Sequence, residues 1–319
     1  MYTALSLCVV VAAIACGYAA WAFHALGAGV TPWAVAFGAL VAWYGVPVAA
    51  VAFWMVVARR FGSPVPPDCR LRGRDWGALY WNEVRSLSGV WPRMIVYRWL
   101  LRDPAPAPAE VPVLLLHGVL CNAGVWCGTA QRLAQAGVPA VYTLSYGPPL
   151  ASIETFAEQL AAKIDAIRAA TGARQVALVG HSMGGLVARA YLRRYGGSGV
   201  RVLVTLGTPH HGSVHARSFP GACLGQMRPG SDWLAALNAD EGVPPPCPIV
   251  SLWSWHDTMV APQLSSRLAG AAEVTFKGIG HNALLDDPAV SAALLRALAA
   301  AGVPARADAA IAAASRPGA

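Results

Sequence analysis

The spacing of apolar and charged residues divides this chain into two parts. Residues 1–58 contain no Lys, Arg, Asp or Glu, and roughly 20 consecutive apolar residues suffice for a helix to cross a bilayer. Two such stretches fit here, Ala4 to Leu26 and Trp33 to Ala58, joined by a short turn at Gly27 to Pro32. The pattern predicts an N-terminal transmembrane helical hairpin over residues 1–60.

Arginines follow the second apolar stretch directly, at Arg59 and Arg60, and continue at Arg70, Arg72 and Arg74. Loops rich in Lys and Arg stay on the cytoplasmic side of a membrane. We therefore expect a multi-pass membrane protein with both ends of the hairpin, and the rest of the chain, in the cytoplasm. A signal peptide is the alternative for the first stretch, but such peptides begin with positive charge, and this chain does not.

Residues 61–110 form a basic, aromatic segment. The net charge of the chain is +8. Its arginines are concentrated between Arg59 and Arg102, among Trp76, Tyr80, Trp81, Trp91, Tyr97 and Trp99. Two interpretations stand equal: a segment lying against anionic lipid headgroups, or a helical cap packed on the domain that follows. Alternating Pro and Ala from Pro104 to Pro108 predict a stiff linker. The sequence lacks the basic fold motif that nucleic-acid binding would require.

Beyond the linker, short apolar runs alternate with helical patterns. The expected strands are Val111 to His117, Pro139 to Ser145, Val176 to Gly180, Val200 to Leu206, Pro248 to Trp253 and Glu273 to Lys277. The expected helices are Val125 to Ala136, Ile153 to Thr171, Gly185 to Arg194 and Ser291 to Ala301. This alternation predicts an α/β domain over residues 111–302, with a mostly parallel sheet and helices on both faces. Residues 303–319 are expected to form a flexible tail.

One insertion breaks the alternation, from Ser213 to Cys247, and it is rich in Gly and Pro. Trp233, Leu234 and Leu237 give it part of a helical apolar face. We interpret residues 213–247 as a lid over an apolar pocket. An exposed loop with one short helix is the alternative.

The motif from Gly180 to Gly184 places Ser182 between a predicted strand and a predicted helix. A sharp strand-to-helix turn of the form Gly-x-Ser-x-Gly exposes the serine hydroxyl above a parallel sheet. Glycine is needed where other side chains would collide. The context therefore predicts a nucleophilic serine, which requires a base and a group that orients the base.

His281 is the expected base, because it lies on a loop after the last predicted strand. The competing histidines are His210, His211, His215 and His256. Asp257 is the expected orienting acid, because it follows the strand that ends at Trp253. The competing acids are Asp232, Asp240, Asp286 and Asp287, with Glu273 as the runner-up.

An oxyanion that forms on the substrate needs backbone N–H donors. One is expected from Met183, directly after the nucleophile. The other is expected from Val119, in the loop that follows the strand ending at His117. We expect four residues to contact the substrate: His117, Gly118, His181 and Trp233.

Several motifs together resemble bacterial triacylglycerol lipases and esterases of the α/β-hydrolase superfamily. They are His117-Gly118 with Asn122 and Trp126, Gly180 to Gly185, Gly207 to Gly212, and Gly280-His281. The resemblance runs from about Val111 to about Leu298. It implies the α/β-hydrolase fold, with Ser182 as nucleophile, Asp257 as acid, His281 as base and an oxyanion loop at residues 117–119. Residues 226–231 with Leu237-Asn238 are similar to the region near the lid of these lipases.

The chain departs from that family in two respects. Its secreted members lack a two-span N-terminus, and several carry a calcium site whose acidic ligands are not found here. No metal and no cofactor are therefore expected. The seven cysteines show no metal spacing. Cys223 and Cys247 could pair across the lid, but free thiols are favoured in a cytoplasmic domain.

These observations predict a membrane-anchored serine ester hydrolase, a lipase or esterase, in a bacterial inner membrane. It would cleave lipid or acyl-ester substrates through an acyl-enzyme on Ser182. A phospholipase, a thioesterase or a lipid acyltransferase would use the same three residues. A non-catalytic membrane scaffold with a hydrolase fold is the alternative from another class.

Overall fold

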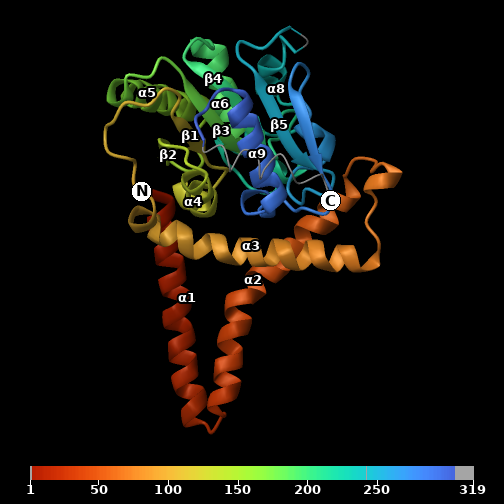
Figure 1. The fold of residues 1–319 in the computed structure, drawn as a ribbon. Helices are drawn as coiled ribbons and strands as arrows, with labels where there is room; N and C mark the ends of the chain where they lie inside the picture. The colour runs from red at the N-terminus through yellow and green to blue at the C-terminus, as the bar shows by residue number, and fades with distance from the viewer. Residues whose placement is uncertain (1, 242, 306–319) are drawn as a thin grey trace.

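The computed structural model describes residues 2–241 and 243–305, so most of the expected flexible tail lies outside the described residues. The N-terminal part is a hairpin of two long helices, α1 (Tyr2–Gly27) and α2 (Pro32–Arg60). Thr31 caps α2, because its hydroxyl accepts a hydrogen bond from the Ala34 N–H at 3.4 Å. The hairpin extends away from the rest of the molecule (Figure 1).

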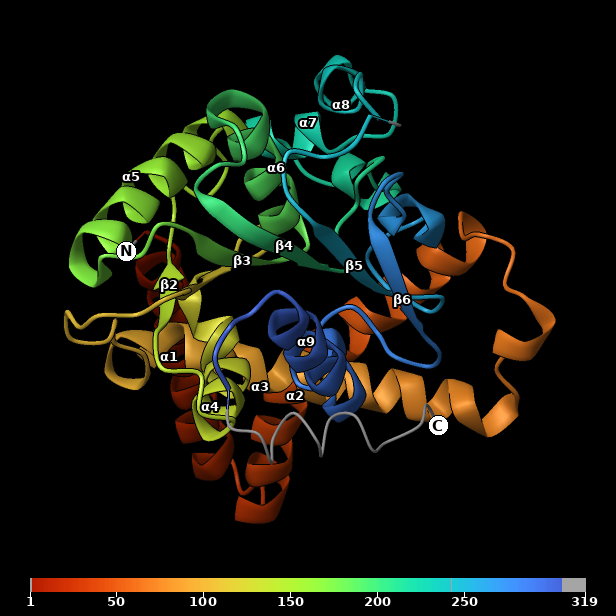
Figure 2. The same ribbon diagram turned by 45° about the horizontal axis from the view of Figure 1, so that its top comes forward.

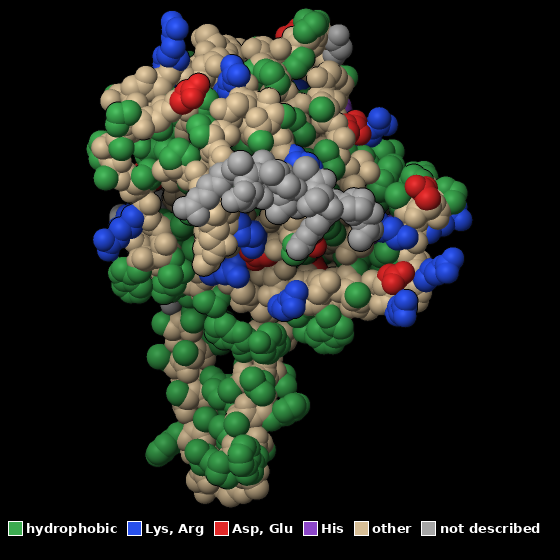
Figure 3. All heavy atoms as spheres, in the orientation of Figure 1, with side chains coloured by type: hydrophobic (Ala, Val, Ile, Leu, Met, Phe, Trp, Pro, Cys, Tyr) green, Lys and Arg blue, Asp and Glu red, His purple; other side chains and the backbone are tan. Residues whose placement is uncertain are grey.

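Apolar side chains cover the hairpin, and Lys and Arg side chains appear at the level of the domain above it (Figure 3). Trp33, near the tip, is 85% exposed. Among the described residues, α2 is one helix that is long and apolar enough to cross a membrane, and Val11–Gly27 forms a shorter apolar stretch. This agrees with membrane association near the N-terminus, whereas the two-span hairpin stays a prediction.

A third long helix, α3 (Gly73–Leu100), follows the short helix η1 (Pro67–Cys69) and lies across the base of the sheet domain (Figure 1). Near its middle, Val84 packs against Val51 of α2. Further along, Met94 belongs to an apolar core that it shares with the sheet. Helix α3 therefore packs on the domain that follows it, and its place against lipid headgroups stays a prediction.

A parallel sheet of six strands forms the centre of the described chain, in the order β2-β1-β3-β4-β5-β6. The strands are β1 (Val113–Leu116), β2 (Val141–Leu144), β3 (Val176–His181), β4 (Val200–Leu206), β5 (Ile249–Ser254) and β6 (Ala272–Phe276). All six expected strands are present, within a few residues of the expected bounds. Because the strands are parallel, the carboxyl ends of β3, β4 and β5 meet at one edge of the sheet.

Helices cover both faces of the sheet (Figure 2). On one face lie α5 (Ile153–Thr171) and α6 (Met183–Tyr195), which share a core with alternate strand residues such as Leu114. On the other face lie α4 (Cys127–Gln135) and α9 (Pro288–Ala300), which share a core with residues such as Leu115. Strands buried on both faces explain the continuous apolar runs in the sequence. Short 3-10 helices complete the domain: η2 (Ala123–Trp126), η4 (Gln263–Ser266) and η5 (Ala283–Leu285).

The insertion at 213–247 folds into η3 (Val214–Arg217), α7 (Ala222–Gln226) and α8 (Asp232–Leu237). Its apolar residues Leu224, Met227, Leu234 and Leu237 are buried in the core that contains α5 and α6. Its interior is therefore packed rather than an exposed loop. Cys223 and Cys247 are free in the structure.

Candidate active site

Ser182 occupies a strained turn between β3 and α6. Its φ is 56° and its ψ is −125°, a backbone conformation that non-glycine residues rarely adopt. Two glycines allow the turn to pack. A Cβ on Gly180 would lie 2.5 Å from the Gly185 nitrogen, and one on Gly184 would lie 2.3 Å from the Leu116 carbonyl oxygen. Strain of this kind persists where the surroundings enforce it, often at functional sites.

Hydrogen bonds hold the turn in place. The Ser182 N–H donates to the Leu206 carbonyl at 2.8 Å, which extends the pairing of β3 with β4. The Thr208 hydroxyl donates to the Ser182 carbonyl at 2.9 Å, and the Gly185 N–H donates to the same oxygen at 3.1 Å. Thr208 lies within the Gly207 to Gly212 motif, but the sequence alone did not indicate its contact with Ser182.

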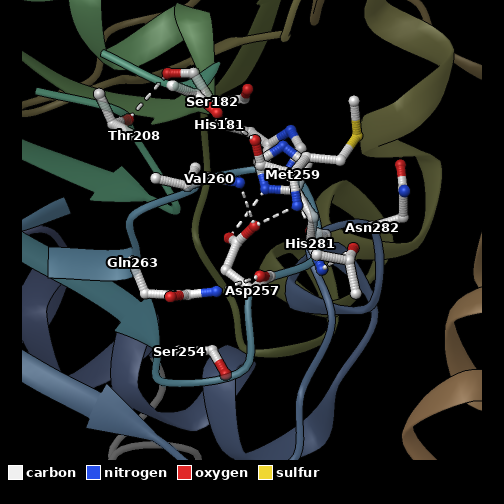
Figure 4. Close-up of polar contacts among 12 residues, drawn as sticks. His181, Ser182, Thr208, Ser254, Asp257, Met259, Val260, Gln263, His281 and Asn282 are labelled. Carbon is white, nitrogen blue, oxygen red and sulfur yellow. Dashed lines mark hydrogen bonds and ion pairs between the residues drawn. The ribbon is translucent and has the colours of Figure 1, made fainter. Parts of the chain in front are cut away.

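Asp257 and His281 form a buried pair. Nδ1 of His281 lies 2.8 Å from Oδ2 of Asp257, and the two side chains are 3% and 1% exposed. The other carboxylate oxygen of Asp257 accepts hydrogen bonds from the N–H groups of Met259 at 2.8 Å and Val260 at 2.7 Å. The Gln263 side chain donates to the Asp257 carbonyl at 3.0 Å. Each oxygen of the carboxylate is therefore held by its own donors (Figure 4).

The pair lies beside the carboxyl end of β4, next to the strand that carries Ser182. A Cβ placed on Gly207 would come within 2.8 Å of Oδ2 of Asp257 and 3.3 Å of Nδ1 of His281. Gly207 directly follows Leu206, which binds the Ser182 N–H. Ser182, Asp257 and His281 thus gather at one edge of the sheet, where Figure 4 draws them together.

The charge state of His281 reflects competing influences. Burial favours the neutral imidazole, but the Asp257 charge, the Asp257 hydrogen bond and the more distant charge of Glu83 outweigh it and raise the pKa of His281. His181 lies against it, with ring centroids 4.6 Å apart. Nε2 of His181 lies 3.1 Å from the His281 carbonyl oxygen. Burial and the neighbouring His281 hold the pKa of His181 well below its ordinary value.

The loop at residues 117–119 lies against Ser182. A Cβ on Gly118 would come within 3.1 Å of the Ser182 Cβ. The His117 ring stacks on Tyr146 with centroids 3.9 Å apart, and the Tyr146 hydroxyl donates to the His117 carbonyl. Burial lowers the pKa of His117 to about 4. This fixed loop carries Val119, whose N–H stays a predicted oxyanion donor together with that of Met183.

Trp233 lies elsewhere. Its indole N–H donates to Glu154 at 2.8 Å, and the Arg193 guanidinium lies 6.0 Å from its ring. Arg193 is near the C-terminal end of α6, whereas Ser182 precedes its N-terminus. Ten residues of helix separate these ends by about 15 Å. Trp233 therefore packs against the outer end of α6, away from the predicted catalytic residues.

Several of the competing acids and histidines have other partners. Glu273 pairs with Arg267 at 3.0 Å, and His211 pairs with Glu241 at 2.8 Å. Asp286 binds Arg93 and Arg132. Asp287 caps α9, and Asp232 lies in the first turn of α8. Among the histidines, His210 contacts Thr205 and His256 contacts Trp76. Within residues 2–241 and 243–305, no group of three or more His, Cys, Asp or Glu residues could hold a metal ion.

A buried carboxylate that sequence analysis missed lies behind the pair. Glu83 of α3 is 0% exposed, and it accepts hydrogen bonds from residues next to Asp257 and His281. One glutamate inside an amphipathic helix gives no sign in the sequence that it reaches a site some 200 positions away.

Comparison with known proteins supports the fold. A family model described as the α/β hydrolase fold matches residues 111–230. Triacylglycerol lipases of Pseudarthrobacter phenanthrenivorans and Burkholderia plantarii are each 35% identical over 117 residues, or 34% of this chain. These alignments cover 36% and 32% of the two lipases, so the chain spans about a third of the length of the curated relatives it matches.

Solved structures are similar over a larger part of the chain. The mature lipase BlEst2 of Bacillus licheniformis superposes with a TM-score of 0.51 at 20% identity, covering 58% of this chain and 91% of that one. Aspergillus fumigatus lipase B superposes with a TM-score of 0.54 at 20% identity, and the match covers 64% of this chain and 57% of the lipase B chain. The sheet domain therefore has the α/β-hydrolase fold, as the sequence predicted.

Proposed function

We propose that this chain is a membrane-anchored serine ester hydrolase of the lipase or esterase kind, which forms an acyl-enzyme on Ser182. The observation that carries the proposal is the buried Asp257–His281 pair, with its 2.8 Å contact, beside the strained turn of Ser182. The triacylglycerol lipases to which the chain is similar add support for ester hydrolysis.

In the first half of the reaction, His281 takes the proton from the Ser182 hydroxyl as the oxygen attacks the acyl carbonyl carbon. Asp257 holds the imidazole in one tautomer and stabilises the imidazolium that forms. The carbonyl oxygen becomes an oxyanion, which the N–H groups of Met183 and Val119 stabilise. When the C–O bond of the ester breaks, His281 returns the proton to the departing alcohol, and the acyl group stays on Ser182.

In the second half, a water molecule replaces the alcohol. His281 takes a proton from the water, and the resulting oxygen nucleophile attacks the acyl-enzyme carbonyl. The new tetrahedral intermediate collapses, the bond to the Ser182 oxygen breaks, and His281 protonates that oxygen. The products are a carboxylic acid and the original enzyme.

The apolar hairpin supports a substrate that already resides in a bilayer. Phe53 of α2 contacts His215 of η3, with ring centroids 6.4 Å apart. The η3 segment lies beside the Asp257 loop, since the Ser213 hydroxyl donates to the Met259 carbonyl at 2.6 Å. The helix that would cross the membrane thus ends next to the predicted site. Arg59 and Arg60, at the end of this helix, favour a cytoplasmic domain on a bacterial inner membrane.

Labelling with a fluorophosphonate probe tests the proposal. The full-length protein in detergent is expected to be labelled and to hydrolyse p-nitrophenyl butyrate, whereas Ser182→Ala should lose the label and ~10⁶-fold in kcat. Ser198→Ala, at an exposed serine, is the matched control and should behave as wild type. Equal labelling of Ser182→Ala would rule out Ser182 as the nucleophile, and a wild-type protein that is neither labelled nor active would favour a scaffold. Product analysis with a lipid extract would distinguish a lipase from a phospholipase, thioesterase or acyltransferase.

A further inference from the structure

Glu83 is a buried acid on α3, a helix that lies outside the sheet domain in the sequence. Its side chain is 0% exposed. A charged group in such a place is costly unless hydrogen bonds replace the water that it loses. Its hydrogen-bond partners therefore indicate what the position requires.

Four neutral donors surround the Glu83 carboxylate. Its Oε1 accepts from the Thr258 hydroxyl at 2.9 Å, the Asn282 N–H at 2.9 Å and the Asn282 side-chain amide at 2.8 Å. Its Oε2 accepts from the Ala283 N–H at 3.0 Å. Hydrogen bonds to a charged acceptor are among the stronger ones in proteins.

These donors belong to the two loops that carry the predicted acid and base. Thr258 directly follows Asp257, and Asn282 directly follows His281. The Thr258 hydroxyl is also 3.4 Å from the His281 N–H, so it links Glu83 to the base as well. One carboxylate thus joins both loops from behind.

Gly280 leaves the space that Glu83 occupies. A Cβ at Gly280 would come within 2.4 Å of Oε2 of Glu83. Gly280, directly before the predicted base, therefore leaves room for the Glu83 side chain from α3. This is a second sign, independent of the hydrogen bonds, that α3 and the His281 loop fit each other.

We propose that Glu83 is a positioning residue for the Asp257–His281 pair, so that α3 forms part of the catalytic unit; this inference rests on the proposed serine hydrolase function. By holding Thr258 and Asn282, Glu83 sets the distance and the orientation between acid and base. Its negative charge also favours the imidazolium that forms during catalysis.

A second contact ties the N-terminal segment to the same loop. The Gln263 side chain accepts from the Ser63 N–H at 2.8 Å and donates to the Asp257 carbonyl at 3.0 Å. Ser63 comes three residues after the end of α2. The linker at residues 104–108 divides the chain in sequence, but segments on both sides of it belong to the catalytic unit.

The test compares Glu83→Gln with Glu110→Gln, the same change at an exposed glutamate. Both full-length proteins are assayed in detergent for p-nitrophenyl butyrate hydrolysis across pH, with melting temperature as a folding check. Glutamine keeps the shape of the Glu83 side chain, but it carries no charge and turns its NH2 group toward a backbone N–H.

We expect Glu83→Gln to lower kcat ~10–100-fold with KM within ~2-fold. The acid limb of its pH–rate profile should move to lower pH, because the Glu83 charge helps to raise the pKa of His281. Glu110→Gln should match wild type.

A Glu83→Gln protein with the kcat and acid limb of Glu110→Gln would overturn the positioning role. In that case the Ser182-dependent activity of the wild type would still support the proposed function. Wild type that is neither labelled nor active would overturn the proposed function itself, and with it this inference.

If Glu83→Gln does not fold, Thr258→Val decides. It keeps the side-chain shape but removes the hydroxyl between Glu83 and the His281 N–H. A kcat at least ~3-fold lower at unchanged KM is expected, since small displacements of reacting groups are costly. An unchanged kcat in folded Thr258→Val would overturn the proposal.

Discussion

Nδ1 of His281 lies 2.8 Å from Oδ2 of Asp257, and both side chains are almost completely buried. Because the Asp257 carboxylate accepts only, Nδ1 must carry a proton, and Nε2 of a neutral His281 is then left as the proton acceptor. Oδ1 of Asp257 is occupied by two backbone N–H groups, so the carboxylate cannot rotate away freely. The pair therefore holds His281 in the tautomer that the proposed general base requires.

Asp257→Asn should therefore lower kcat by ~10³–10⁴, because an amide can present the wrong partner to Nδ1 and carries no charge to stabilise an imidazolium. The measurement is steady-state hydrolysis of p-nitrophenyl butyrate. Glu273→Gln, at the runner-up acid on β6, should keep full activity because Glu273 pairs with Arg267 on the surface. The opposite ranking of the two variants would identify Glu273 as the acid.

Activity should rise with pH through the pKa of His281, because the base must be neutral to accept a proton. The Asp257 contact raises this pKa, so the midpoint should lie above the ordinary histidine value of about 6.5. The pKa values of His117, His181 and His256 are lowered, so these groups should stay neutral across this limb. The check is kcat/KM from pH 5 to 9. His211→Gln, at a half-exposed histidine, should leave the midpoint unchanged, and a midpoint below 6 would contradict the assignment.

The same shift predicts a pH effect on folding. A raised pKa in the folded state means that folding favours protonated His281. The resulting stabilisation is complete below the unfolded pKa of about 6.5 and is lost as pH rises through the folded pKa. Thermal unfolding of the wild type and of His281→Gln, compared across that window, should show a pH-dependent difference of this sign. A difference that grows with pH would contradict it.

Gly184→Ala should be destabilising and inactive. The added Cβ would meet the Leu116 carbonyl oxygen at 2.3 Å, and that oxygen belongs to a buried strand that cannot move aside. Overpacking of this kind costs ~1–3 kcal/mol. Gly225→Ala is the matched control, because a Cβ there meets nothing within 4 Å and Gly225 lies in helix α7. The melting temperature and kcat are measured for both variants. A Gly184→Ala protein with the melting temperature and kcat of the wild type would mean that the turn is packed differently.

Thr208→Val should lower kcat ~10-fold with little effect on KM, since the Thr208 hydroxyl holds the Ser182 carbonyl at 2.9 Å and thereby the strained turn. Loss of a hydrogen bond should also cost ~1 kcal/mol of stability. Thr171→Val removes a comparable buried hydroxyl at the end of α5. It should lose stability but keep kcat, so equal kcat values for the two variants would show that Thr208 acts on stability alone.

Some features of this protein follow from local patterns in the sequence. Apolar runs of four to seven residues between helical periods predicted the parallel sheet, because strands buried on both faces admit few polar residues. Glycines around Ser182 indicated the turn, since no other residue fits against Leu116 and Gly185. The order of Ser182, Asp257 and His281 along the chain placed each at a strand end, and parallel strands bring such ends to one edge.

Other features depend on contacts between distant segments. The aromatic and basic pattern of residues 61–110 suits a helix on a membrane or on a protein. The structure packs one side of α3 against the sheet domain, while Trp81 and Trp99 stay exposed. Trp233 looked like part of a substrate pocket, but its indole packs on Glu154 and Arg193.

Glu83 shows most directly the difference between what local patterns determine and what depends on distant contacts. Helical periodicity records which side of α3 is apolar, but it does not record which loop a single acid on that side will meet. That depends on how α3 docks, and the Thr258 and Asn282 donors are 175 and 199 positions away. The sequence determined the fold class and the predicted chemical groups, because these rest on local spacing. Only the tertiary structure decided what supports those groups, because long-range packing brings their partners together.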